Sequence, residues 1–255
     1  MRTSSVLISL AFVALASART FTVVNSCSYT VWPAIFTDLT LGSSTPDQPT
    51  GWEQEPKEVV TFSVPNDWTG GRIWGRRDCN FSVTDGPSSC LTGGCNGGLE
   101  CDPHTGTPVA PVTVAEFALG ASGSIDVFDV SLVDGFNIPI RVQTNKGCAV
   151  VSCPVDLNPN CDVGPAALAG PFDSSGKVAG CKSACAAGLG DPANSPNCCT
   201  GTHSTPSTCP ASGVQFYSYF KGNCPTAMAF VYDQSTAPLS CPSTLQSDYT
   251  ITFCP

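Results

Sequence analysis

Four acidic side chains lie within twenty positions of one another in this chain: Glu116, Asp126, Asp129 and Asp134. Carboxyl groups that converge on one site can do general acid–base chemistry, because burial or a neighbouring charge keeps one protonated while another stays ionised. The alternative is that these acids lie on the solvated face of a strand, where charged side chains are common. The four acids therefore suggest an acidic cleft without establishing one.

Two predicted strands would position these acids. Residues 116–119 and 125–133 are rich in β-branched and aromatic residues, and a Gly/Ser break at 120–123 separates them. Aspartate has a poor strand propensity, so its repeated use in such segments needs a reason. A rigid sheet that presents carboxylates at one mouth would supply that reason.

The spacing of Asp129 and Asp134 places a condition on such a cleft. Successive side chains of a strand point to opposite faces, so these two residues would face away from each other on one unbroken strand. They converge only if the strand bends or ends between them. Gly135 and Pro139 favour a turn that begins near Val133, which would bring Asp134 back to the side of Asp129.

The first 18 residues are expected to be a cleaved secretory signal peptide. Arg2 precedes an apolar run at 6–15, and Ala-Ser-Ala at 16–18 is typical of a signal peptidase site. No later stretch offers about 18 consecutive apolar residues, so no membrane span is expected. The mature protein, residues 19–255, is therefore predicted to be soluble and secreted, in the extracellular space or the cell wall.

The charge balance excludes some partners. Without Arg2 the chain keeps ten Lys and Arg residues against twenty Asp and Glu residues, a net charge of −10. Nucleic acids and anionic membranes both require basic patches, so neither is an expected partner. Three of the ten cations, Arg72, Arg76 and Arg77, lie within six positions, and a cation there could pair with the acids described above.

The sixteen Cys residues are expected to form eight disulfides, because their number is even and the destination is oxidising. Zinc binding is the alternative, but two His residues offer few further ligands, so no metal and no cofactor is expected. Spacing alone does not give the pairing, although the adjacent Cys198 and Cys199 should have different partners. Asn80, in Asn80-Phe81-Ser82, is the one candidate glycosylation site.

Short strands separated by loops are predicted for the rest of the chain. Only 12% of residues are charged, and 24 Gly with 22 Pro favour turns over long helices. Residues 36–56 are expected to form a surface loop. The expected strands are 20–25, 29–33, 59–64, 140–142 and 248–253, the expected short helices are 165–168 and 181–187, and strand or turn is expected at 215–221 and 227–233.

Motifs spread over the whole chain match those of one known family. They are Phe21-Thr22-Val23-Val24-Asn25 with Cys27, Thr30-Val31-Trp32, Arg72-Ile73-Trp74, the run from Cys90 to Cys101, Glu116-Phe117, Asp134-Gly135-Phe136-Asn137-Ile138-Pro139, Tyr219-Phe220-Lys221 and Phe253-Cys254-Pro255. Through them residues 19–255 resemble the thaumatin-like proteins. The loops after Phe36 and around 171–180 look long for plant members, which suggests a fungal-type branch.

The resemblance implies a mainly β fold, with a β-sandwich core, a Cys-rich and partly helical second domain at 148–224, and a small region of disulfide-stapled loops at 79–110. It also implies the disulfide pairs, since the Cys residues follow the order of the family. These are Cys27–Cys254, Cys79–Cys90, Cys95–Cys101, Cys148–Cys241, Cys153–Cys224, Cys161–Cys181, Cys185–Cys198 and Cys199–Cys209.

An acidic cleft is also implied by the resemblance, formed by Arg72, Glu116, Asp129, Asp134 and Asp233. Family members with β-1,3-glucanase activity are interpreted through the positions of Glu116 and Asp134. We expect desolvation to raise the pKa of Glu116, so that it acts as the general acid. We expect Asp134 near Arg72 to stay ionised as nucleophile or base.

Binding and slow hydrolysis of β-1,3-glucan by a monomer is the function that the resemblance implies. Arg72, Asp129 and Asp233 are expected to bind the sugar chain, together with the rings of Phe136 and Tyr219. Two alternatives stay open. Many family members bind β-1,3-glucan or act against fungi without clear hydrolysis, and a protein of this kind could instead be an inhibitor or a structural wall protein.

Overall fold

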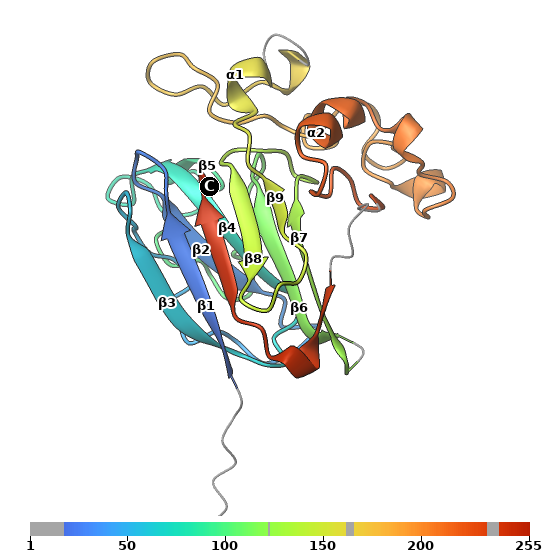
Figure 1. Cartoon of the computed structure of the whole chain (residues 1–255). Helices are drawn as coiled ribbons and strands as arrows, with labels where there is room; N and C mark the ends of the chain where they lie inside the picture. Colours follow the sequence, from blue (N-terminus) through green and yellow to red (C-terminus); the bar gives the residue numbers. More distant parts are fainter. Residues whose placement is uncertain (1–17, 122, 162–165, 234–239) are drawn as a thin grey trace, which may run out of the picture.

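Two β-sheets packed face to face form the centre of the computed structural model, which describes residues 18–121, 123–161, 166–233 and 240–255 (Figure 1). One sheet has the strand order β3-β1-β11-β8-β9 and the other the order β10-β7-β6-β4-β2, with β5 paired to β4. The strands are β1 (Ala18–Asn25), β2 (Trp32–Thr37), β3 (Val59–Pro65), β4 (Gly71–Cys79), β5 (Cys90–Thr92), β6 (Val114–Ala121), β7 (Ile125–Ser131), β8 (Ile140–Thr144), β9 (Val151–Cys153), β10 (Ser240–Pro242) and β11 (Tyr249–Phe253).

This architecture confirms the expected mainly β fold. All the strand pairs are antiparallel except β1 with β11, the two strands that carry the ends of the described chain. Except for Ala18, the expected signal peptide lies outside the described residues, so its cleavage stays a prediction.

Aromatic side chains fill the space between the sheets. The ring of Phe21 on β1 lies 5.0 Å from that of Phe117 on β6, 5.0 Å from that of Tyr249 on β11 and 5.6 Å from that of Trp68. Alternation along each strand sends every second side chain into this core. The residues between them, such as Glu116 on β6, therefore face outward from the sheet.

The outward face of the β2-β4-β6-β7 sheet is partly covered by the stapled loops of 79–110. Buried Trp74 and Val114 pack there against the disulfide of Cys95 and Cys101. Arg76 fixes these loops, because its guanidinium donates to the carbonyl oxygens of Gly98 at 2.8 Å and Leu99 at 2.7 Å. Arg76 is thereby used for structure and not for pairing with the acids.

Asp126 is also used for structure. It is fully buried on the inward face of β7, where it forms an ion pair with Arg19 of β1. It also accepts hydrogen bonds from Tyr249 Oη at 2.9 Å, Ser243 Oγ at 2.7 Å and the Gly120 amide at 3.0 Å. Burial acts to raise the pKa of Asp126, but these donors outweigh it and lower that pKa below its ordinary value.

All eight expected disulfides are confirmed, and Cys198 and Cys199 have different partners. Cys27–Cys254 ties the start of the sandwich to its end. Strand β9 joins the β1-containing sheet, whereas the described segments that follow it, 154–161 and 166–224, lie beyond one end of the sheets (Figure 1).

Helices are short and occur where the sequence is hardest to interpret. Residues 215–221, expected as strand or turn, form most of α2, and residues 181–187, expected as a helix, form hydrogen-bonded turns. A helix was also expected at 165–168, and the described residues of that range, 166–168, form a 3-10 helix. The helices are α1 (Asn158–Cys161), α2 (Tyr217–Asn223) and the 3-10 helices η1 (Ala166–Leu168), η2 (Gly201–His203), η3 (Ala211–Gly213) and η4 (Ser243–Leu245).

Packing decides these outcomes. The α2 helix has only seven residues, too few to be stable alone, and it is held by buried Phe220 and by Tyr217 against Phe230. In a similar way β2 extends to Thr37, into the expected loop, because Phe36 is buried against the stapled loops. Neither local propensity nor period shows such contacts.

Candidate functional site

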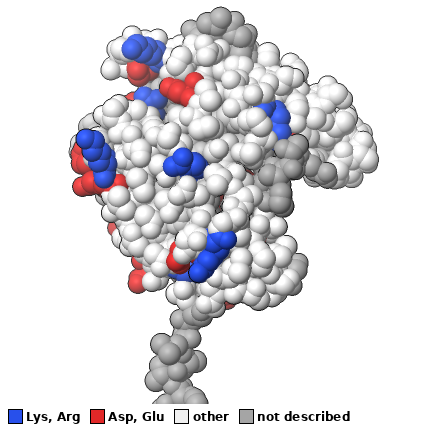
Figure 2. All heavy atoms as spheres, in the orientation of Figure 1, with Lys and Arg blue, Asp and Glu red and all other residues white. Residues whose placement is uncertain are grey.

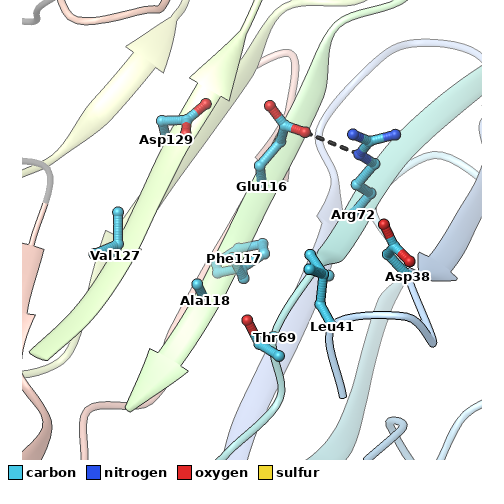
Figure 3. A pocket seen from close by; sticks show the side chains of 11 residues that line it. Asp38, Leu41, Thr69, Arg72, Glu116, Phe117, Ala118, Val127 and Asp129 are labelled. Carbon is cyan, nitrogen blue, oxygen red and sulfur yellow. Dashed lines mark hydrogen bonds and ion pairs between the residues drawn. The ribbon is translucent and has the colours of Figure 1, made fainter. Parts of the chain in front are cut away.

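Three charged side chains stand opposite one another on neighbouring strands of the second sheet. Arg72 on β4 is in register with Glu116 on β6, and Glu116 is in register with Asp129 on β7. Figure 3 shows them side by side on the same face of the sheet. Residues that are directly opposite on paired strands have Cβ atoms about 4.5–5.5 Å apart, so these charges form one row.

Asp134 joins this row because β7 ends before it. The strand stops at Ser131, and a turn closed by the Gly135 amide on the Leu132 carbonyl at 2.8 Å follows. Gly135 has φ +98°, and a Cβ there would lie 2.4 Å from the Cys181 carbonyl oxygen, so the turn requires glycine. The expected end of the strand near Val133 is confirmed.

The row forms the floor of a groove made of two hollows. Both hollows are lined by Arg72, Glu116 and Asp129, so they are continuous at the row. One extends over Asp38, Leu41 and Thr69, which Figure 3 shows around the row. The other is lined further by Pro108, Val114, Ser131, Val133, Asp134, Met228 and Val231.

Arg72 forms an ion pair with Glu116. Its Nε donates to Glu116 Oε1 at 2.9 Å, and the two side chains are 41% and 34% exposed. A pair this exposed contributes little to stability, about 0–1 kcal/mol. Its importance is that it places the single cation of the row against Glu116.

Asp129 has no such partner. Its Oδ1 is buried and makes no hydrogen bond within the described parts of the chain. Burial and, to a smaller extent, the charge of Glu116 raise the pKa of Asp129 to about 7, against the opposing effect of Arg72. Below neutral pH this carboxyl is therefore largely protonated, which also removes the repulsion between two opposite carboxylates.

The sequence profile of the thaumatin family matches residues 25–255. The chain belongs to the thaumatin family. It is 42% identical over 244 residues to pathogenesis-related thaumatin-like protein 3.5 of Cryptomeria japonica, which covers 94% of this chain and 91% of that protein. It is 37% identical over 246 residues to thaumatin-like protein 1 of Arabidopsis thaliana, with 92% and 86% covered.

Among solved structures, a thaumatin-like xylanase inhibitor is similar at a TM-score of 0.45 and 22% identity, covering 92% of this chain and 99% of that one. The two sequence relatives are plant proteins, and the expected fungal-type branch stays a prediction. The eight disulfides of this thaumatin family member fit an extracellular protein. In the ranges that the structure describes, no helix is long and apolar enough to cross a membrane, and no three His, Cys, Asp or Glu side chains are placed to hold a metal ion.

Two observations bear on the expected division of roles between the two carboxyls of this family member. Arg72 pairs with Glu116, not with Asp134. Desolvation raises the pKa of Asp134, Arg72 lowers it less, and Glu116 adds to the rise. The pKa of Asp134 is thus raised although Arg72 acts against the rise, and its role as nucleophile or base stays a prediction.

Asp233 does not line the groove. It is 4% exposed and accepts hydrogen bonds from Lys221 Nζ at 2.8 Å, Tyr217 Oη at 3.1 Å and the Ala229 amide at 2.8 Å. These bonds tie α2 to the segment after it. The expectation that Asp233 binds sugar is corrected to a structural role.

The two aromatic residues expected to hold sugar do not reach the groove either. Phe136 is fully buried, in a bridge with Cys181. Tyr219 donates its hydroxyl to the Leu157 carbonyl at 2.7 Å and is absent from the described residues that line either hollow. Sequence reasoning missed Asp38, which lies in a loop with no motif of its own.

Proposed function

We propose that this thaumatin family protein binds β-1,3-glucan along the groove and hydrolyses it slowly at internal bonds. The observation that carries the proposal is the row of Arg72, Glu116 and Asp129 with Asp134 beside it. Glycoside hydrolysis needs one protonated and one ionised carboxyl at the same bond. Because the two hollows meet at the row, a long chain can lie on both sides of it.

Asp134 is the better proton donor of the two expected catalytic residues. It is exposed at the groove, so it can reach a glycosidic oxygen, and desolvation raises its pKa. Its proton passes to that oxygen as the bond to the anomeric carbon breaks, and the leaving sugar departs as an alcohol. As that bond breaks, Glu116 either gives an electron pair to the anomeric carbon, forming a glycosyl-enzyme that water then hydrolyses with Asp134 as the base, or takes a proton from the water that attacks the carbon.

Asp129 would keep the row from carrying three negative charges. With a pKa of about 7 it is largely neutral at mildly acidic pH. A neutral carboxyl can donate one hydrogen bond and accept others, which suits sugar hydroxyls. Asp129 is thus a binding residue in this proposal, as the sequence analysis expected.

Binding without hydrolysis is the second candidate. The ion pair with Arg72 occupies one oxygen of Glu116, which weakens it as a nucleophile. In addition, Phe117 alone is aromatic among the described residues that line the groove, and it is 3% exposed. A groove without exposed rings holds sugar through hydrogen bonds only, and such contacts suit slow or weak action.

The deciding experiment measures reducing ends released from a linear β-1,3-glucan, together with sedimentation of the protein with insoluble glucan. Glu116→Gln and Asp134→Asn should each lower turnover about 10²- to 10⁴-fold while sedimentation is kept. Asp47→Asn, an exposed acid outside the groove, is the matched control and should match the unsubstituted protein.

Two results would reject the catalytic part of the proposal. If the unsubstituted protein sediments with glucan and releases no reducing ends, the groove only binds. If both variants retain full turnover, hydrolysis does not use these carboxyls. Failure to sediment with β-1,3-glucan at all would reject the substrate.

A further inference from the structure

A second polar hollow lies away from the groove, between β4, α1 and the hairpin at 172–178. It has a volume of about 490 Å³, and no residue of the groove lines it. Its lining residues are Arg77, Asp156, Asn158, Pro159, Asp173, Gly176, Lys177 and Val178.

Two walls of this hollow are held by contacts within the protein. Arg77 is fixed over the ring of Tyr29, with its Cζ 4.9 Å from the ring centroid. In the hairpin, Asp173 Oδ1 accepts the amides of Ser175 at 2.8 Å and Lys177 at 2.9 Å, and the Asp173 amide donates to the Lys177 carbonyl at 2.8 Å. The hollow is therefore formed before any ligand arrives.

Asn158 supplies an unsatisfied acceptor. It is 2% exposed, its Nδ2 donates to the Asn137 carbonyl at 2.9 Å, and its Oδ1 has no partner in the described chain. The orientation of the amide is not ambiguous, because the reverse assignment would set two oxygens against each other. Buried amide oxygens are normally hydrogen-bonded, so this one is unusual.

Arg77, which lines the same hollow from β4, supplies an unsatisfied donor. Its Nε is buried and has no hydrogen-bond partner within the described ranges. The residues that line the hollow include both donors and acceptors, and a hydroxyl, which both donates and accepts, suits such a lining. Both atoms are buried, so a ligand meets the terminal guanidinium nitrogens of Arg77 and the exposed Lys177 first.

The charges around the hollow cancel. Arg77 and Lys177 are balanced by Asp156 and Asp173. Figure 2 shows basic and acidic spheres together over the loop that lies beside α1 in Figure 1. A balanced set of donors and acceptors favours a neutral ligand over a phosphate or an ammonium ion.

An exposed ring stands at the edge of the hollow. Phe172 is 54% exposed and is the bridge partner of Val178, which lines the hollow. Bridge partners of a hairpin present their side chains on the same face. An aromatic face next to a set of polar groups is the arrangement that holds a sugar ring, which has an apolar face and a rim of hydroxyls.

We propose that this hollow is a second carbohydrate site, which binds one neutral sugar unit between Arg77 and Lys177 with Phe172 at its edge. The site is separate from the groove and does no chemistry. On a polysaccharide it would act as an anchor, because two linked sites on one chain bind more tightly than either alone.

The test is an NMR titration of the ¹⁵N-labelled secreted protein with a linear tetramer of β-1,3-linked glucose and, separately, a tetramer of β-1,4-linked xylose. Saturable shifts at the Lys177 and Val178 amides and at the Asn158 side-chain amide are expected with at least one of them. The titration is repeated with Glu116→Gln, which leaves the second hollow unchanged, so the result does not depend on the groove being catalytic.

Two exposed side chains give variants that should fold normally. Lys177→Ala and Phe172→Ala should each weaken binding at this site about tenfold. The matched control Lys146→Ala removes an exposed lysine outside the hollow and should not change it. Shifts that stay within the groove, no shifts with either tetramer, or equal affinity in all three variants would overturn the proposal and leave water as the occupant.

Discussion

The two faces of β7 treat the same residue type in opposite ways. Asp126 lies on the inward face and Asp129 three positions later on the outward face. Asp126 is completely buried yet its pKa is lowered, whereas the partly buried Asp129 has its pKa raised to about 7. Burial therefore does not decide the direction of the shift.

The number of donors decides it. Asp126 accepts hydrogen bonds from Arg19, Tyr249, Ser243 and the Gly120 amide, all of which favour the carboxylate. Asp129 has one buried oxygen without a donor among the described residues, and a carboxyl lies directly opposite it. On the inward face the donors thus stabilise the charged form of Asp126, which helps to hold the fold together. On the outward face Asp129 is left able to exchange its proton.

The largest expected effect comes from Asp126→Asn. The substitution keeps the shape of the side chain but leaves Arg19 buried without a counter-ion. Removal of one partner from a buried ion pair costs about 3–5 kcal/mol of the free energy of unfolding. Denaturant unfolding with the disulfides intact measures this loss.

Asp129→Asn is the matched control for that loss, since the same change is made three residues along the same strand. It removes no ion pair, so it should not destabilise the protein at neutral pH. Equal losses for the two variants would contradict the comparison between the faces of β7.

The second prediction concerns pH. The folded-state pKa of Asp129, about 7, lies above the unfolded value of about 3.9, so the folded protein binds more protons between these values. The stability contributed by this proton is complete below the unfolded pKa and is lost as pH rises through the folded pKa.

Asp129→Asn should therefore gain on the unsubstituted protein as pH rises from about 4 to about 7, by up to about 1.4 kcal/mol per pH unit and a few kcal/mol in total. Unfolding curves of both proteins across this range test it. Asp126 acts in the opposite direction, because a lowered pKa gives stability that is lost in acid. A difference that shrinks with rising pH would reject the assigned shift.

The sequence predicted the groove better than it predicted the chemistry in it. Strand patterns and the turn at Gly135 placed Glu116, Asp129 and Asp134 together, and the resemblance to the family added Arg72. The register that sets Glu116 between Arg72 and Asp129 is irregular beyond Ala118, so it could not be counted from the sequence. Which carboxyl receives the cation depends on that register.

Contacts between residues far apart in the chain also could not be predicted from the sequence. Asp126 pairs with Arg19, 107 positions away, and nothing near either residue indicates the other. The resemblance placed Asp233 in the cleft. In the structure Asp233 instead forms an ion pair with Lys221 of α2, a helix that the sequence analysis did not expect. Family motifs predict which residue type stands at a position, but the contacts that the residue makes in the folded protein decide whether it has a structural role or lines the groove.

The smallest expected effect on stability comes from Arg72→Met, which tests the outward-facing row of charges in the comparison between the two faces of β7. Met keeps most of the apolar stem of Arg, and the half-exposed ion pair with Glu116 is worth at most about 1 kcal/mol. The effect on proton binding should be larger, because Arg72 lowers the pKa of both Asp129 and Asp134. Without it both pKa values rise further.

If Asp134 is the proton donor, the alkaline limb of the pH profile of glucan hydrolysis should then move to higher pH in Arg72→Met, since the donor keeps its proton longer. Arg141→Met on β8 of the other sheet is the control and should leave the limb in place. A limb that moves to lower pH would mean that the group titrating there is not a carboxyl facing Arg72. A stability loss well above 1 kcal/mol would show that the outward row, like the inward Asp126, is part of what holds the sandwich together.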